Sequence, residues 1–103
     1  MSFTGKARAV LRAEAHHLKP LVHIGHHGIT PPVTQTVDDA LRTHELVKIQ
    51  TGKTSDVTAK QAVEQLAAQL NAEVIQVIGR TATLYRHNPA IVRRAGDVPP
   101  WKR

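Results

Sequence analysis

Residues 25–28 read GHHG, so two histidines lie between two glycines, and the sequence TPP follows at residues 30–32. Imidazole rings can bind a metal ion or act in acid–base catalysis. Glycines lack a Cβ, which lets a phosphate backbone come close to main-chain N–H groups. The chemistry of this segment is therefore one of three kinds: a metal site, a catalytic histidine pair or a loop that binds phosphate.

The density of histidines makes a metal site the first alternative. Five of them fall within twelve residues: His16, His17, His23, His26 and His27. A zinc site needs three or four ligands that converge tetrahedrally, usually with help from cysteine or carboxylate. The chain has no cysteine, and no Asp or Glu lies between Glu14 and Asp38. We therefore expect no metal or other cofactor, while metal binding or sensing by these histidines stays open as the main alternative function.

Catalysis has little support in this sequence. Of the two serines, Ser2 lies at the terminus and Ser55 lies in a turn, where a helix cap explains it. Asp38 and Asp39 are adjacent on a predicted helix, and adjacent helical residues point in different directions. The sequence GKT at residues 52–54 is not a P-loop, because the glycine required five residues earlier is Val47. We expect no enzymatic activity.

The charge of the chain favours a polyanionic partner. Fourteen Lys and Arg against eight Asp and Glu give a net charge of +6. Residues 1–29 carry +3, residues 30–78 carry −2 and residues 79–103 carry +5. If the fold brings the two basic ends together, they form one basic face of the kind that binds nucleic acid.

The elements that hold the GHHG segment follow from hydrophobic spacing. A first helix, which Thr4 can cap, has its apolar positions between residues 7 and 18, and a second begins at the Thr30 cap. A third helix ends near residue 70, with Ser55 or Asp56 as its cap. Strands are predicted at residues 21–24, 46–50, 73–78 and 81–86. The GHHG segment thus connects a strand to a helix.

This order, α-β-α-β-α-β-β, predicts a two-layer α/β sandwich with a mixed four-stranded sheet. Helix-linked strands favour parallel crossovers, and the last two strands form an antiparallel hairpin. The β-branched residues at 73–78 indicate a central strand, whereas residues 81–86 alternate like a strand with one solvated face. We expect one domain over residues 1–88 and a basic, proline-containing tail over residues 89–103.

Four short sequences together resemble a known family. They are LKP before the first strand, GHHG after it, HELVK at the start of the second strand and VIGRTATLYR in the final hairpin. The segment from Leu11 to Arg86 is similar to the CRM domain, and to the small YhbY-like bacterial proteins that consist of one such domain. The resemblance implies a fold similar to the C-terminal domain of translation initiation factor 3. It also implies association with precursors of the large ribosomal subunit, and no known enzymatic activity.

The same resemblance implies which residues contact RNA. The RNA-contacting loop of the family corresponds to Gly25, His26, His27 and Gly28, and basic residues expected on the same face are Lys19, Arg80 and Arg86. The sequence departs from the family inside the loop, where small polar or basic residues are usual instead of two histidines. How much positive charge the loop supplies is therefore open.

The sequence thus predicts an RNA-binding protein, with ribosomal RNA or a large-subunit precursor as its partner. We expect a cytoplasmic monomer, because no apolar stretch approaches the ~20 residues of a membrane span and nothing requires a second copy. Aromatic residues are scarce, so a sheet of exposed base-stacking rings is excluded. A module that binds a protein on the ribosome is a further alternative.

Overall fold

The computed structural model describes residues 5–88, and they form three helices and a four-stranded sheet. Predictions for Thr4, for residues 89–103 and for the basic groups there lie outside the described residues. The elements in chain order are α1 (Gly5–Ala15), β1 (Val22–Ile24), α2 (Pro31–His44), β2 (Leu46–Thr51), α3 (Ala59–Leu70), β3 (Glu73–Ile78) and β4 (Thr81–Tyr85). The predicted α/β order and the mixed sheet are confirmed.

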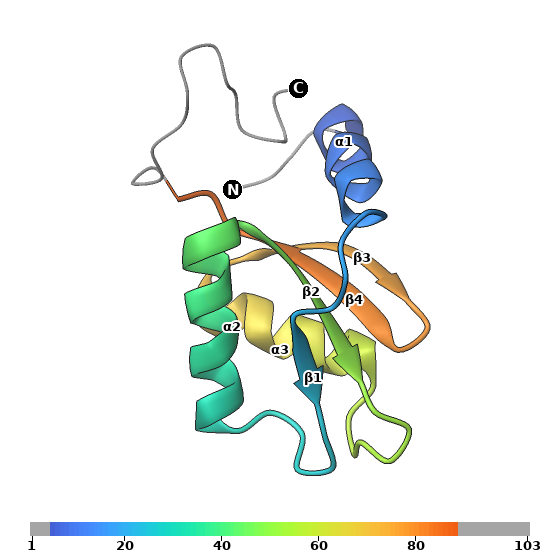
Figure 1. Cartoon of the computed structure of the whole chain (residues 1–103), viewed down its shortest axis with the longest axis vertical. Coiled ribbons are helices and arrows are strands. Elements are labelled where there is room, and N and C mark those ends of the chain that lie inside the picture. The colour runs from blue at the N-terminus through green and yellow to red at the C-terminus, as the bar shows by residue number, and fades with distance from the viewer. Residues whose placement is uncertain (1–4, 89–103) are drawn as a thin grey trace.

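The sheet has the strand order β1-β2-β4-β3. β1 and β2 pair in parallel through the α2 crossover, and β4 pairs antiparallel with both of its neighbours. β3 therefore runs in the same direction as β2, although β4 lies between them (Figure 1). As a consequence, the carboxyl ends of β1, β2 and β3 and the start of β4 meet at one end of the sheet.

The main core lies between one face of the sheet and the helices α2 and α3. Alternate strand residues point to this face because successive side chains in a strand point to opposite sides. Val47 and Ile49 of β2 are fully buried there against Val37 and Leu41 of α2. The i, i+4 spacing of the two α2 residues places them on one face of that helix. Val63 and Leu66 of α3 complete the core.

The helix α1 packs on the opposite face of the sheet, so it adds a partial third layer to the predicted two. Leu11 and Ala15 of α1 bury the strand residues that alternate with those of the main core, namely Leu46, Ile75 and Tyr85. Two polar contacts fix the helix: Arg8 donates to the carbonyl oxygen of Val74 at 2.7 Å, and Lys48 Nζ donates to that of Ala15 at 3.3 Å. All of these contacts lie at the end of the sheet where β2 begins and β4 ends.

The predicted cap of the third helix is wrong. Thr58 is the N-cap of α3: its hydroxyl accepts from Gln61 N at 3.1 Å, and the Gln61 side chain accepts from Thr58 N at 3.0 Å. This reciprocal capping box satisfies two backbone donors at once, which the predicted caps could not do. Ser55 instead accepts a hydrogen bond from Val57 N in the preceding turn. The Thr30 cap of α2 is confirmed, since Thr30 accepts from Val33 N.

The predicted places of the last two strands are also wrong. β3 is an edge strand and β4 is central, because the hairpin folds β4 back between β3 and β2. Residues 82–85 of β4 are consequently buried on both faces, and Tyr85 is only 1% exposed. None of the helices within residues 5–88 is long and apolar enough to cross a membrane.

Candidate nucleic-acid interface

Three loops meet where the carboxyl ends of the strands lie together. They are residues 25–28 after β1, residues 52–55 after β2 and residues 79–80 between β3 and β4. We refer to these three segments as the loop edge. Two of the loops lie at the lower end of the molecule in Figure 1, and α1 lies at its upper end. The topology of the sheet therefore joins segments that are up to 55 residues apart in the sequence.

Hydrogen bonds connect the three loops. Gly52 N donates to the carbonyl oxygen of Ile24 at 3.0 Å, which ties the second loop to the end of β1. Thr51 N donates to the carbonyl oxygen of Arg80 at 2.8 Å, which ties the end of β2 to the β3–β4 turn. His26 Nδ1 lies 3.3 Å from the carbonyl oxygen of Thr54. The loop edge is therefore one connected surface.

The two glycines of the first loop have different structural roles. Gly28 has φ +67° and is buried, so glycine is the residue that this backbone conformation favours. Its N–H closes the turn on the carbonyl oxygen of Gly25 at 3.1 Å. Gly25 has no positive φ, and a Cβ there would meet nothing within 4 Å. Neither conformation nor packing within the described residues explains why residue 25 is a glycine.

The donors that this loop offers come from its own backbone and not from the following helix. The backbone N–H groups of His26 and His27 have no acceptor within residues 5–88. The start of α2 offers little, because Pro31 and Pro32 have no N–H and Thr30 already accepts from Val33 N. The N-terminal end of α2 can therefore contribute little to anion binding, and the two loop amides of His26 and His27 remain as donors.

The histidine side chains are exposed and lie edge to face, with ring centroids 5.4 Å apart. A carbonyl oxygen only accepts, so His26 Nδ1 carries the proton in its contact with Thr54. His26 Nε2 is then an acceptor in the neutral ring and becomes a donor only when the ring is protonated. His26 can therefore donate to a phosphate oxygen through Nε2 only in its charged form.

Two cations border a hollow at the loop edge. Lys53 and Arg80 are exposed, and neither side chain has a hydrogen bond or ion pair to another described residue. They line a hollow of about 270 Å³ together with Ser55 and Thr58. The sequence predicts Arg80 in the RNA site but not Lys53, because the segment around Lys53 resembles only an incomplete P-loop. The sheet topology, not the sequence spacing, places the two together.

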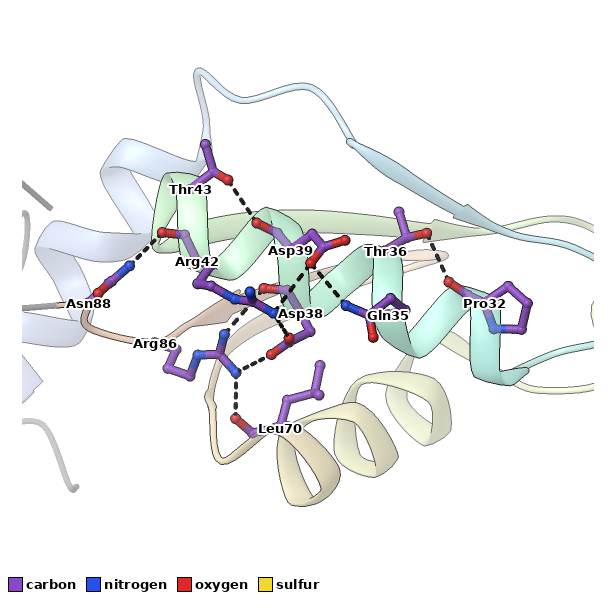
Figure 2. Close-up of polar contacts among 10 residues, drawn as sticks. All are labelled: Pro32, Gln35, Thr36, Asp38, Asp39, Arg42, Thr43, Leu70, Arg86 and Asn88. Atoms are coloured by element: carbon purple, nitrogen blue, oxygen red, sulfur yellow. Dashed lines mark hydrogen bonds and ion pairs between the residues drawn. The ribbon is translucent and has the colours of Figure 1, made fainter. Parts of the chain in front are cut away.

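The other two basic residues expected in the site lie elsewhere. Lys19 is exposed in the segment before β1, at the end of the sheet away from the loop edge. Arg86 follows β4 at that same end, and its guanidinium donates to Asp38 Oδ1 at 2.8 Å and to the carbonyl oxygen of Leu70 at 2.9 Å. Figure 2 shows Arg86 between Asp38 of α2 and the end of α3. The structure thus brings Arg80 and residues 25–28 together, and separates them from Lys19 and Arg86.

The carboxylate that binds Arg86 has an altered acidity. Hydrogen bonds from Arg42 and Arg86 hold the pKa of Asp38 below its ordinary value of 3.8. The same pairing with Asp38 raises the pKa of Arg42. Arg86 is only 23% exposed in its side chain and makes its contacts inside the protein, so its charge is largely used in holding α2, α3 and β4 together.

The histidines do not converge on a metal site. Within residues 5–88 there is no group of three or more His, Cys, Asp or Glu side chains that could hold a metal ion. His16 and His17 follow α1, His23 lies on the face of β1 and the other two lie in the first loop. The five histidines are therefore close together in the sequence but do not converge in space.

A family model for the CRS1/YhbY (CRM) domain matches residues 3–86. The chain belongs to the CRM domain family. This confirms the resemblance that LKP, GxxG, HELVK and VIGRTATLYR indicate. The described fold is thus that of a CRM domain, and it covers most of the chain.

Several known proteins are similar to this chain over most of its length. A Pseudomonas aeruginosa protein that carries the name probable RNA-binding protein is 30% identical over 89 residues, which cover 86% of each chain. A Bacillus subtilis protein that also carries the name probable RNA-binding protein is 29% identical over 85 residues, which cover 82% of this chain and 88% of the Bacillus subtilis protein. The solution structure of a hypothetical protein from Staphylococcus aureus covers 95% of this chain at 28% identity, with a TM-score of 0.66.

Proposed function

We propose that this CRM domain binds RNA with the loop edge against the phosphate backbone. The observation that carries the proposal is Gly25, a glycine that neither backbone conformation nor packing requires and that lies beside two unpaired loop amides. A residue without a side chain lets a phosphate come within hydrogen-bond distance of those amides. Lys53 and Arg80 add positive charge on the same edge.

The RNA that we propose is ribosomal, in a precursor of the large subunit. The names of the relatives support RNA as the partner, and the CRM resemblance supports the ribosomal precursor. The loop edge itself offers backbone amides, cations and two imidazoles, which bind phosphate whatever the base sequence. Selection of one ribosomal site therefore requires contacts beyond this edge.

The test measures the affinity for fragments of large-subunit ribosomal RNA across a series of salt concentrations, with and without EDTA. The variant is Gly25→Asp, and the matched control is Gly5→Asp at the start of α1. A Cβ at either glycine meets nothing within 4 Å, and neither has a positive φ, so both variants add the same charge without strain. The two positions lie at opposite ends of the sheet.

We expect Gly25→Asp to weaken binding roughly fivefold or more, because a carboxylate about 4 Å from a phosphate costs about 1 kcal/mol in bulk water and up to about 4 kcal/mol near a protein surface. Gly5→Asp should change the affinity by less than about threefold, as expected for a distant charge screened by salt. EDTA should have no effect. Equal losses in the two variants would contradict the loop-edge interface, and loss of binding in EDTA would favour the metal alternative.

A further inference from the structure

Among residues 5–88, the sheet face opposite α2 and α3 is covered at one end only, by α1. The strand register gives two rows of side chains on the uncovered part. His23, Gln50, Thr81 and Ile78 form the row next to the loop edge, and Lys48, Thr83 and Gln76 form the row behind it. The next row contains Leu46 and Tyr85, which α1 covers. A polar surface about two residues deep thus adjoins the loop edge.

A hollow of about 130 Å³ lies in this surface, lined by Lys48, Gln76, Ile78, Thr81 and Thr83. It holds several times the ~30 Å³ of a water molecule and less than the ~300–1,000 Å³ of a typical small-molecule pocket. Its size suits one small flat group.

The uncharged polar side chains around the hollow have no hydrogen-bond partner within residues 5–88. Thr83 is only 2% exposed, and no hydrogen bond joins its side chain to another residue within 5–88. The side chains of Thr81 and Gln76 likewise make no hydrogen bond there. Because these side chains line the hollow and make no hydrogen bond within residues 5–88, their donors and acceptors are available to a group that enters it.

The chemistry of the lining indicates an uncharged ligand with both donors and acceptors. An amide and two hydroxyls each donate and accept. The one charged residue, Lys48, directs its ammonium to the carbonyl oxygens of Ala15 and Leu18 instead. Ile78, 58% exposed, provides an apolar surface at the side of the hollow. A phosphate would require cations and a metal would require carboxylates or imidazoles, whereas a nucleobase edge matches these groups.

We propose that this hollow binds one RNA base and gives the protein a base preference. The inference rests on the proposed RNA binding and extends it, since Thr81 directly follows Arg80 of the loop edge. A phosphate held at Arg80 and a base held at Thr81, Thr83 and Gln76 then belong to neighbouring positions of one RNA strand. The loop edge then supplies affinity, and the hollow supplies discrimination between bases.

The test compares affinities for unstructured ten-nucleotide oligomers of A, C and U, for the wild type and for Thr83→Val. Valine keeps the shape of threonine and removes only the hydroxyl. Thr36→Val on α2, whose hydroxyl donates to the carbonyl oxygen of Pro32, is the matched control on the far side of the sheet. Gln76→Met on the edge strand β3 is a second variant that preserves length and tests the same hollow if Thr83→Val is unstable.

The wild type should prefer one oligomer by roughly tenfold or more, as a base contact with good geometry provides. Thr83→Val and Gln76→Met should each reduce that preference roughly three- to tenfold, the value of one lost hydrogen bond. The dependence of affinity on salt should be the same as in the wild type, because no phosphate contact is removed.

Equal wild-type affinity for all three oligomers would overturn the base-binding hollow and leave the proposed RNA binding intact. A preference that is unchanged in both Thr83→Val and Gln76→Met would also overturn it. Absence of salt-dependent binding to every oligomer would overturn the proposed function itself, and the hollow with it.

Discussion

Lys53 and Arg80 are the two side chains at the loop edge that carry permanent charge without an internal partner in the described protein. Most other arginines of the described chain are engaged: Arg8 pairs with Glu73 at 3.0 Å, and both Arg42 and Arg86 pair with Asp38. A cation that is already paired contributes less to an external phosphate, because the internal bond must be broken. The charge available for RNA is therefore more local than the net charge of +6 indicates.

Replacement of either free cation should have a defined electrostatic effect. Lys53→Gln and Arg80→Gln should each reduce the slope of log affinity against log salt by about 1, and weaken all RNA sequences alike. Lys6→Gln, an exposed change on α1 at the other end of the sheet, is the control and should leave the slope unchanged. Equal slopes for wild type, Lys53→Gln and Arg80→Gln would remove these residues from the interface.

At the scale of elements, Asp38 connects α2 with β4 and, through Arg86, with the end of α3. The pKa of Asp38 is lowered in the folded protein, so its contribution to stability is complete above about pH 4 and is lost as the pH falls through the folded value. Asp38→Asn should lower the free energy of unfolding by about 1–2 kcal/mol near neutral pH, after allowance for partial exposure.

The difference in unfolding free energy between wild type and Asp38→Asn should stay constant between about pH 7 and pH 5 and shrink below about pH 4. Urea denaturation at several pH values measures it. Asp39→Asn, the same change at the adjacent residue with 60% exposure, should cost less than about 0.5 kcal/mol. A cost for Asp38→Asn that does not change with acidity would show that the carboxylate charge is not what links these elements.

Local sequence signals predicted the helices and strands well, but they did not predict which strands pair with one another. Thr30 followed by two prolines determines where α2 begins, and that prediction is confirmed. The capping box of Thr58 and Gln61 is also visible in the sequence, but Ser55 and Asp56 in the preceding turn are equally typical caps, so the sequence alone predicts the wrong one. The place of β4 between β2 and β3 depends on contacts between residues far apart in the chain, so strand composition alone gave the wrong edge.

In the candidate site, too, local features could be predicted from the sequence, whereas contacts between distant residues could not. The GxxG segment was recognisable from its residues and its place between a strand and a helix. The ion pair of Arg86 with a residue 48 positions earlier could not be seen in the sequence, nor could the alignment of Thr83 with Gln76 on an open sheet face. Arg80, Lys53 and residues 25–28 share one edge only because β1, β2 and β3 run in the same direction.

On the scale of the whole molecule, the two faces of the sheet differ in charge. The helices α2 and α3 together carry three acidic and two basic residues, a net charge of −1, whereas α1 on the other face carries three basic residues and one acidic residue, a net charge of +2. An RNA that follows the loop edge onto the open sheet face stays on the side of α1 and away from α2 and α3. Neutralisation of two phosphates by Lys53 and Arg80 contributes about −1.4 to −1.8 to the log–log salt slope.

The most direct test of the loop-edge interface follows each backbone amide by NMR while an RNA oligomer is added. The interface predicts that the largest shift changes occur at residues 25–28, 52–55 and 79–80, with smaller changes along the open face of β3 and β4. Amides on the outer faces of α2 and α3 should stay unchanged. Changes that are largest on α2 and α3, with the three loops unaffected, would contradict the interface.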